Sequence, residues 1–161
     1  MPLNDSIGKM PTIRSELVEL LVRHEIGEAI EDEGHDDWLT LLGKETDKWA
    51  ELHLRAIKDL IADTSDRGAL KFVVDERNKA LLFLYAALLP GIEREMFPEM
   101  MNAVQHFSED GDWSLIEKTR IIGYRKGCRL RNSVLSLGTG DMIRQHLESA
   151  KKAGWLTGLP V

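Results

Sequence analysis

The chain has 161 residues, a formal net charge of −6, 43% hydrophobic side chains and 30% charged side chains. This length and composition predict a single folded domain with its own core, and they exclude a wholly disordered chain. The acidic balance disfavours a generally basic nucleic-acid-binding protein, and the lone Cys128 excludes an internal disulfide. The N-terminus has no apolar signal segment, and no apolar run approaches the ~20 residues of a membrane span. We therefore expect a cytoplasmic protein that makes no membrane contact.

The first part of the domain is expected to be a long helix with an unusual pattern. Residues 1–11 are predicted to be a disordered leader ended by Pro11, and residues 12–161 to form one helical domain. The first helix is predicted near 13–33, and it is apolar on two sides. One side carries leucines; the other carries Val18, Val22, Ile26, Ala29 and Ile30. Such a helix is normally sandwiched between neighbours, so we expect the face with Val22, Ile26 and Ala29 to be buried.

Further helices are predicted near 38–42, 46–63, 69–89, 92–107, 113–137 and 141–153. The stretch 80–89 is apolar on every side, so we expect it at the centre of the fold. A break is expected at Pro98, because proline suits the first turn of a new helix. No window of useful length alternates apolar and polar residues as a strand does. The sequence therefore predicts an all-α fold, a single compact helical bundle of six or seven helices.

Four potential metal ligands lie near the end of the first predicted helix: His24, Glu28, Glu31 and His35. Their spacing places them on one helical face, and imidazole together with carboxylate can hold zinc or iron. Di-iron carboxylate bundles use Glu-x-x-His pairs, which this sequence lacks. The four residues also lie opposite the face that we expect to be buried. A metal site and a solvated acidic helix end are both open, and we favour the second.

His53 is the second candidate, because it lies in the apolar sector of the helix predicted over 46–63. A histidine in this position can be a cofactor ligand to haem iron or a metal, or a pH-sensitive switch. The alternative, which we favour, is a structural histidine whose ring nitrogens bond to backbone or side-chain groups.

A basic segment is the most informative electrostatic feature. Between residues 118 and 140 lie six basic residues and no acidic ones: Lys118, Arg120, Arg125, Lys126, Arg129 and Arg131. The rest of the chain therefore has a formal charge of −12, and residues 25–37 hold seven acidic residues without Lys or Arg. The basic segment can bind phosphates, nucleic acid or an acidic partner, or it can lie against the protein's own acidic segment. Gly123 and Gly127 in the same segment permit a close helix contact, either within the fold or across a dimer.

Two stretches resemble known families. The segment 140–156, Gly-Asp-Met-Ile-Arg-Gln-His-Leu-Glu-Ser-Ala-Lys-Lys-Ala-Gly-Trp-Leu, resembles the recognition helix of winged-helix regulators, although no β wing follows it. Over about 13–137, a Trp-led third helix, a long apolar helix and a long final helix resemble the order in haem-free globin-like sensor domains of bacterial stress-signalling proteins. The first resemblance implies a nucleic-acid-binding regulator, and the second implies a sensory domain.

No catalytic motif is recognised, so the sequence favours a non-enzymatic regulatory or sensory domain. It is expected to act through a protein partner or as a homodimer, with the basic segment as a docking face, and to bind a small or anionic ligand. One alternative is nucleic-acid binding through the basic segment and the final helix, with contacts from Arg144, Gln145, Lys151 and Lys152. The other is a haem or metal protein that uses His53 or the His24 set.

Overall fold

The computed structural model describes residues 10–137 and 140–155, and every regular element in these ranges is a helix. The helices are α2 (Met10–Asp32), α3 (Asp36–Lys44), α4 (Lys48–Thr64), α5 (Ala69–Glu76), α6 (Lys79–Leu88), α7 (Gly91–Met96), α8 (Pro98–Asp110), α9 (Trp113–Leu135) and α10 (Gly140–Lys152). The prediction of a compact all-α fold is confirmed. None of the helices described is long and apolar enough to cross a lipid bilayer. The predicted leader lies outside the described residues up to residue 9, and residues 10 and 11 already belong to α2.

Several helix ends follow from local side chains. Asp47, Asn78 and Asp112 each precede a helix and accept a hydrogen bond from a backbone N–H in its first turn. At the other end, Gly154 follows α10 with a φ of 70°, a conformation that glycine adopts without strain. The chain then turns back, and Trp155 is buried against the bundle with its N–H donated to the Ala150 carbonyl.

Two of the predicted segments are each divided into two helices. The segment 69–89 is interrupted at Arg77, which has a φ of 49°, and Asn78 then starts α6. The segment 92–107 is divided at Phe97, and Pro98 begins α8 in the first-turn position that its missing N–H favours. Asn78 was a recognisable N-cap residue in the sequence, whereas the left-handed Arg77 was not foreseeable from its side chain.

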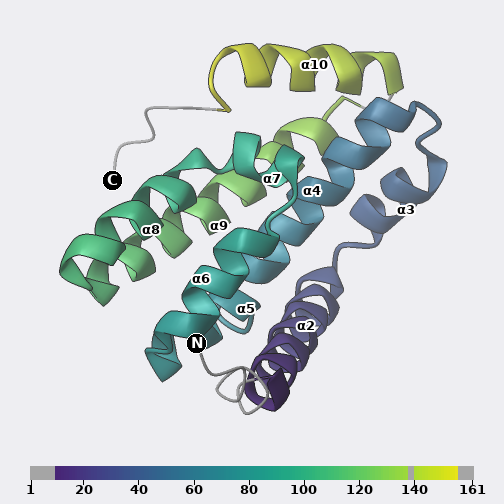
Figure 1. Ribbon diagram of the computed structural model, residues 1–161. Helices are drawn as coiled ribbons and strands as arrows, with labels where there is room; N and C mark the ends of the chain where they lie inside the picture. Colours follow the sequence, from purple (N-terminus) through teal and green to yellow (C-terminus); the bar gives the residue numbers. More distant parts are fainter. Residues whose placement is uncertain (1–9, 138–139, 156–161) are drawn as a thin grey trace.

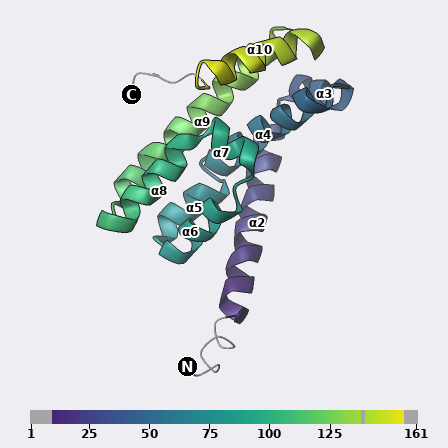
Figure 2. The same cartoon turned by 45° about the horizontal axis from the view of Figure 1, so that its top comes forward.

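The centre of the bundle is α4, which packs against α2 on one side and α9 on the other (Figures 1 and 2). Leu54 and Ile57 in this helix are completely buried. The expectation that residues 80–89 form the centre is wrong. In α6, Leu88 is 54% exposed, because this short helix covers the surface of the bundle and borders a pocket.

Glycines allow α9 to approach α4 closely. A Cβ atom on Gly123 would lie 2.9 Å from the Thr64 side chain, and one on Gly127 would lie 2.6 Å from the Ile61 side chain, both on α4. The close contact that these two glycines permit is therefore made within the fold.

The helix α2 lies at the edge of the bundle (Figures 1 and 2). Its inner face carries Leu20, which is 5% exposed, beside polar residues. At Gly27 the two backbones meet, since a Cβ atom there would lie 2.4 Å from the Ala62 carbonyl oxygen. His24 and Glu28 consequently face α4, and Val22 and Ile26 face outward with 45% and 37% exposure. The prediction that the Val22, Ile26 and Ala29 face is buried is therefore wrong. The leucine side of the predicted pattern reaches the core at Leu20, whereas the valine and isoleucine side does not. The rest of the inner contact depends on glycine and on charged pairs, which hydrophobic periodicity does not reveal.

Candidate functional site

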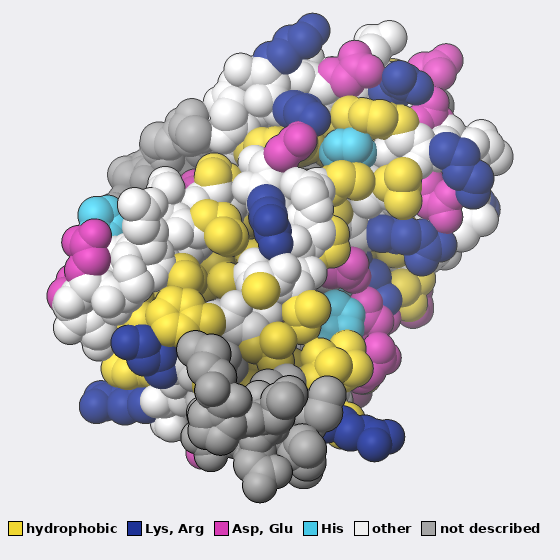
Figure 3. All heavy atoms as spheres, viewed as in Figure 1, with side chains coloured by type: hydrophobic (Ala, Val, Ile, Leu, Met, Phe, Trp, Pro, Cys, Tyr) yellow, Lys and Arg dark blue, Asp and Glu magenta, His cyan; other side chains and the backbone are white. Residues whose placement is uncertain are grey.

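A pocket of about 230 Å³ opens between α2, α4 and the α6–α7 region. Its walls are mostly aliphatic, and its polar groups come from four helices. The lining residues are Leu17, Leu20, Leu21, His24, Asp59, Asp63, Ala69, Tyr85, Leu88, Leu89, Pro90 and Glu93. On the face seen in Figure 3, hydrophobic side chains lie beside a histidine and acidic side chains, the same combination that lines the pocket. The volume is below the roughly 300–1,000 Å³ of drug-sized ligand sites, so the pocket fits a small ligand.

His24 is anchored to α4 by Asp63. The His24 Nδ1–H donates to Asp63 Oδ1 over 2.8 Å, which leaves Nε2 on the side of Glu28, 3.6 Å from its Oε1. The hydrogen bond to Asp63 raises the pKa of His24 to about 9, against the lowering effect of burial. At neutral pH His24 is therefore a cation, and its first counter-ion is Asp63.

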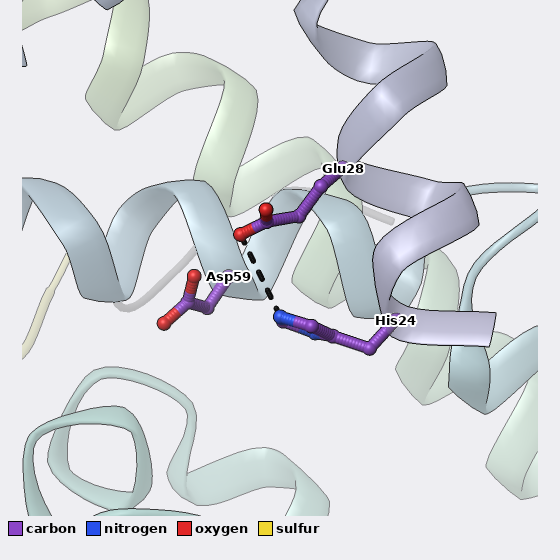
Figure 4. Close-up of side chains that lie close together, drawn as sticks. All are labelled: His24, Glu28 and Asp59. Carbon is purple, nitrogen blue, oxygen red and sulfur yellow. Dashed lines mark ion pairs between the residues drawn. The ribbon is translucent and has the colours of Figure 1, made fainter. Parts of the chain in front are cut away.

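Glu28 and Asp59 lie on the other side of the His24 ring (Figure 4). One donor atom from each of His24, Glu28 and Asp59 lies within 4.8 Å of the other two. Lys58 Nζ also reaches Glu28, at 3.0 Å, and Asp32, at 3.3 Å. Burial alone would raise the pKa of Glu28, but the hydrogen bond and charge of Lys58 outweigh it and lower that pKa.

Two carboxyl groups at the pocket, Asp59 and Glu93, have raised pKa values, although the positive charge of His24 lowers both. Burial raises the pKa of Asp59 to about 6 and that of Glu93 to about 8. The carboxylates of Asp59 and Asp63 add to the effect at Glu93, because like charges disfavour its ionisation. Glu93 is 7% exposed, so at neutral pH it is mainly a protonated acid in an apolar pocket.

Tyr85 supplies an unpartnered polar group at the same place. Its side chain is buried at 6% exposure, and its hydroxyl finds no hydrogen-bond partner in the described part of the chain. Burial, followed by the charges of Asp63 and Glu93, raises the pKa of this hydroxyl well above the ordinary tyrosine value. A buried hydroxyl without a partner costs free energy, and a ligand in the pocket can supply one.

The charges around the pocket do not balance. The cations are His24 and Lys58, and the acids are Glu28, Asp32, Asp59, Asp63 and Glu93. Such an excess of acid, partly suppressed by protonation, favours binding of a further positive charge.

The sequence of the chain matches a known protein family. The model of a family described as "Family of unknown function (DUF6866) C-terminal domain" matches residues 4–153. The chain belongs to this family. Neither the curated proteins nor the solved structures contain a match. DUF6866 membership therefore names no activity, and the site must be interpreted from its own geometry.

In this DUF6866 domain, the predicted metal set is divided. His24 and Glu28 come together and are joined by Asp59 from α4. Glu31 instead accepts a hydrogen bond from the Tyr124 hydroxyl on α9, at 3.2 Å. His35 lies at the start of α3, where its Nδ1 is buried without a hydrogen-bond partner among the described residues.

His53 is buried at 4% exposure, between aromatic rings. Its ring stacks on Trp49, with centroids 3.7 Å apart, and faces Trp155 at 5.9 Å. Nδ1 donates to the Trp49 carbonyl oxygen at 2.7 Å, whereas Nε2 has no hydrogen-bond partner within the described ranges. Burial lowers the pKa of His53, so the ring is neutral at physiological pH. No pocket described above reaches it, and its role as a cofactor ligand stays a prediction.

The predicted basic docking face does not form one exposed surface. Lys118, Arg125 and Arg129 are exposed, whereas Arg120, Lys126 and Arg131 are buried. The Arg120 guanidinium donates to the Thr64 carbonyl and pairs with Glu117 and Asp66. Lys126 donates to the Met96 carbonyl and pairs with Glu99. Within the described residues, no cation of this segment forms an ion pair with the acidic segment 25–37.

Of the four residues of the final helix that were predicted to contact nucleic acid, two form ion pairs within the protein. Arg144 pairs with Asp47 and Glu148 and lies over the Trp49 ring, and Lys151 pairs with Glu95. Gln145 and Lys152 are exposed.

The sequence did not single out Asp59, Asp63, Tyr85 or Glu93. A signal existed for Asp63, which falls within about 40° of Trp49 on a helical projection and therefore lies in the apolar sector of α4. An acid in such a sector needs a partner, and His24 provides it. Glu93 carried no such signal, since its burial depends on how the Pro90-Gly91 turn places α7.

Proposed function

We propose that this protein is a ligand-binding domain with a regulatory or sensory role, whose pocket holds the cationic end of a small apolar ligand. The observation that carries the proposal is the pair of carboxyl groups at the polar end of an aliphatic pocket, the half-buried Asp59 and the buried Glu93. The regulatory role agrees with the sequence, in which no catalytic motif was recognised.

A primary ammonium group fits this environment chemically. It donates three hydrogen bonds, for which the carboxyl groups of Asp59 and Glu93 and the Tyr85 oxygen are available acceptors. Its charge offsets the excess of acid, so that Glu93 ionises on binding and releases a proton. The aliphatic walls, with Leu17, Leu20 and Leu88 among them, cover an alkyl tail.

Calorimetry with butylammonium and with its neutral counterpart butanol tests this proposal. We expect butylammonium to bind more tightly than butanol and to release a proton near pH 7, seen as a heat that depends on the ionisation enthalpy of the buffer. The variant Glu93→Gln should weaken butylammonium at least about tenfold, the loss expected for a buried charge pair. The matched control is Glu95→Gln, on the same helix but paired with Lys151 at the surface. Equal affinity for the amine and the alcohol, or no effect of Glu93→Gln, would contradict the proposal.

A divalent metal ion is the second candidate, favoured by the convergence of His24, Glu28 and Asp59. The Asp63 carboxylate fixes the proton of His24 on Nδ1, and a carboxylate behind a histidine is a common support for a metal ligand. Lys58 competes with the ion for Glu28. Zinc binding that His24→Gln abolishes and His106→Gln leaves intact would support this function; zinc binding that persists in His24→Gln would exclude it.

The other functions expected from the sequence stay predictions. The globin-like helix order is not tested by the comparisons, because no solved structure matches the chain. The homodimer and protein-partner interpretations require an exposed surface suited to a partner. Nucleic-acid binding would now depend on Lys118, Arg125 and Arg129, with the exposed part of the final helix. A DNA affinity that falls steeply with salt, and falls further in a variant lacking those three charges, would support it.

A further inference from the structure

The outward face of α2 is a continuous apolar surface that the pocket does not explain. Five large aliphatic side chains are exposed on this one helix: Val18 (53%), Leu21 (56%), Val22 (45%), Ile26 (37%) and Ile30 (42%). Single exposed aliphatic residues are normal, but a contiguous row of them marks an interaction surface. Elsewhere in the described residues, large exposed hydrophobic side chains are isolated on different helices, as Leu52 is on α4.

Charged residues at defined positions interrupt and flank this face. At about 100° per residue, Arg14, Val18, Val22, Glu25, Ala29 and Glu33 fall within an arc of about 100°. Arg14 lies near the start of α2, and Glu33 follows its last residue. Arg14, Glu25 and Glu33 are exposed, and none of them forms an ion pair with a described residue. The two ends of the apolar face thus carry opposite, unneutralised charges.

This charge pattern suits a second copy of the same helix in the opposite direction. With a two-fold axis between residues 23 and 24, Arg14 lies opposite Glu33 of the partner subunit, and Val18 lies opposite Ala29 of the partner subunit. Val22 lies opposite Glu25 of the partner subunit, so the centre of the contact holds one carboxylate from each copy. Opposite charges then meet at both ends of the contact. In a parallel arrangement Arg14 would face its own copy, as would Glu25 and Glu33, and like charges would meet along the whole length.

We infer that the protein forms a homodimer in which α2 packs antiparallel to α2 of the partner subunit. The interface is isologous, so each residue pair occurs twice. This inference goes beyond the proposed ligand binding and does not depend on it. It also links ligand binding to dimerisation, because Leu21 lines both the pocket and the outward face of α2.

Sedimentation velocity over a wide concentration range tests the dimer. We expect the wild-type chain to dimerise and Val22→Glu to raise the dissociation constant at least about tenfold, since it replaces an apolar contact by a second carboxylate opposite Glu25 of the partner subunit. Leu52→Glu is the control, because it makes the same kind of change at an equally exposed position on α4 and should leave the dimer intact. A monomer at every concentration, or a dimer that Val22→Glu leaves unchanged, overturns the inference.

Charge reversal tests the direction of the helices. Arg14→Glu and Glu33→Arg should each raise the dissociation constant about threefold, as expected for an exposed ion pair. The double variant should return it to the wild-type value, because both pairs are then restored with their signs exchanged. Failure of the double variant to recover overturns the antiparallel arrangement, even if the dimer itself is real.

Discussion

The two sides of α4 are held together in different ways. Towards α9, Gly123 and Gly127 let side chains of Thr64 and Ile61 fill the contact, and two buried cations of α9, Arg120 and Lys126, have acidic partners. Towards α2, the backbones touch at Gly27, but the contact then opens into a pocket with more acids than cations. A contact that is filled and balanced in charge stabilises the fold. An open contact with an excess of acid is less stable by itself, and a cationic ligand that fills it lowers the free energy of the protein by binding.

The largest expected difference is between one acid on each side, Glu99 beside α9 and Glu93 at the pocket. Glu99→Gln should lower the free energy of unfolding by about 3 kcal/mol, because it leaves the ammonium of Lys126, which is 1% exposed, without its counter-charge. Glu93→Gln on the pocket side should cost nothing, or stabilise the protein, above pH 8, because it removes a carboxyl group whose ionisation burial opposes. Urea denaturation measures both.

Lys126→Met is the control for this pair of variants. Replacing the buried cation by an apolar side chain of similar length should be nearly neutral, since Glu99 is 30% exposed and regains water. If Glu93→Gln destabilised the protein as much as Glu99→Gln, the proposed contrast between balanced and unbalanced charge would be incorrect.

Alanine substitutions of glycines on the two sides should change the free energy of unfolding, measured by urea denaturation, by different amounts. Gly27→Ala should cost about 2 kcal/mol, because the new methyl group meets the Ala62 carbonyl oxygen, and backbone must move. Gly127→Ala should cost about 1 kcal/mol, since its neighbour is the Ile61 side chain, which can change rotamer. Gly43→Ala in α3 has open space around it and should stabilise the protein by up to about 1 kcal/mol. A smaller loss at Gly27 than at Gly127 would contradict the close backbone contact on the α2 side.

The sequence predicted the α4–α9 side better than the α2 side. Apolar periodicity placed the helix over 46–63, loop and cap residues placed the helix over 113–137, and the spacing of Gly123 and Gly127 indicated a close contact. On the α2 side the same periodicity indicated the wrong buried face, because Val22 and Ile26 form an outward surface. His24 and Glu28 were recognised as potential ligands, but their partners on α4 lie about 35 residues away in sequence, and no local pattern connects them.

Stability should depend on pH chiefly through the α2 side. His24 has a folded pKa of about 9 against an ordinary value of 6.5, so its contribution is complete below pH 6.5 and is lost as pH rises towards 9. Glu93, with a folded pKa of about 8, acts in the same direction, because the folded state holds its proton more tightly than the unfolded state does. The free energy of unfolding should therefore fall between pH 6.5 and 9, by about 2 kcal/mol after solvent screening. His24→Gln should flatten the pH dependence of the free energy of unfolding. If the pH dependence of that variant is the same as in the wild type, it arises from groups other than His24.

The smallest expected effect isolates a single contact of the α2 side, the one between His24 and Asp63. Asp63→Asn keeps the shape of the side chain but removes the carboxylate that holds the His24 proton, so the pKa of His24 should fall from about 9 towards its ordinary value of 6.5. The ring-proton chemical shifts of His24 in an NMR titration report this directly. Asp66→Asn is the matched control, since Asp66 pairs with Arg120 on the α9 side and should leave the His24 titration unchanged. A high pKa that survives Asp63→Asn would mean that the general excess of acid holds the proton. The charge of the pocket would then belong to the whole cluster rather than to one ion pair.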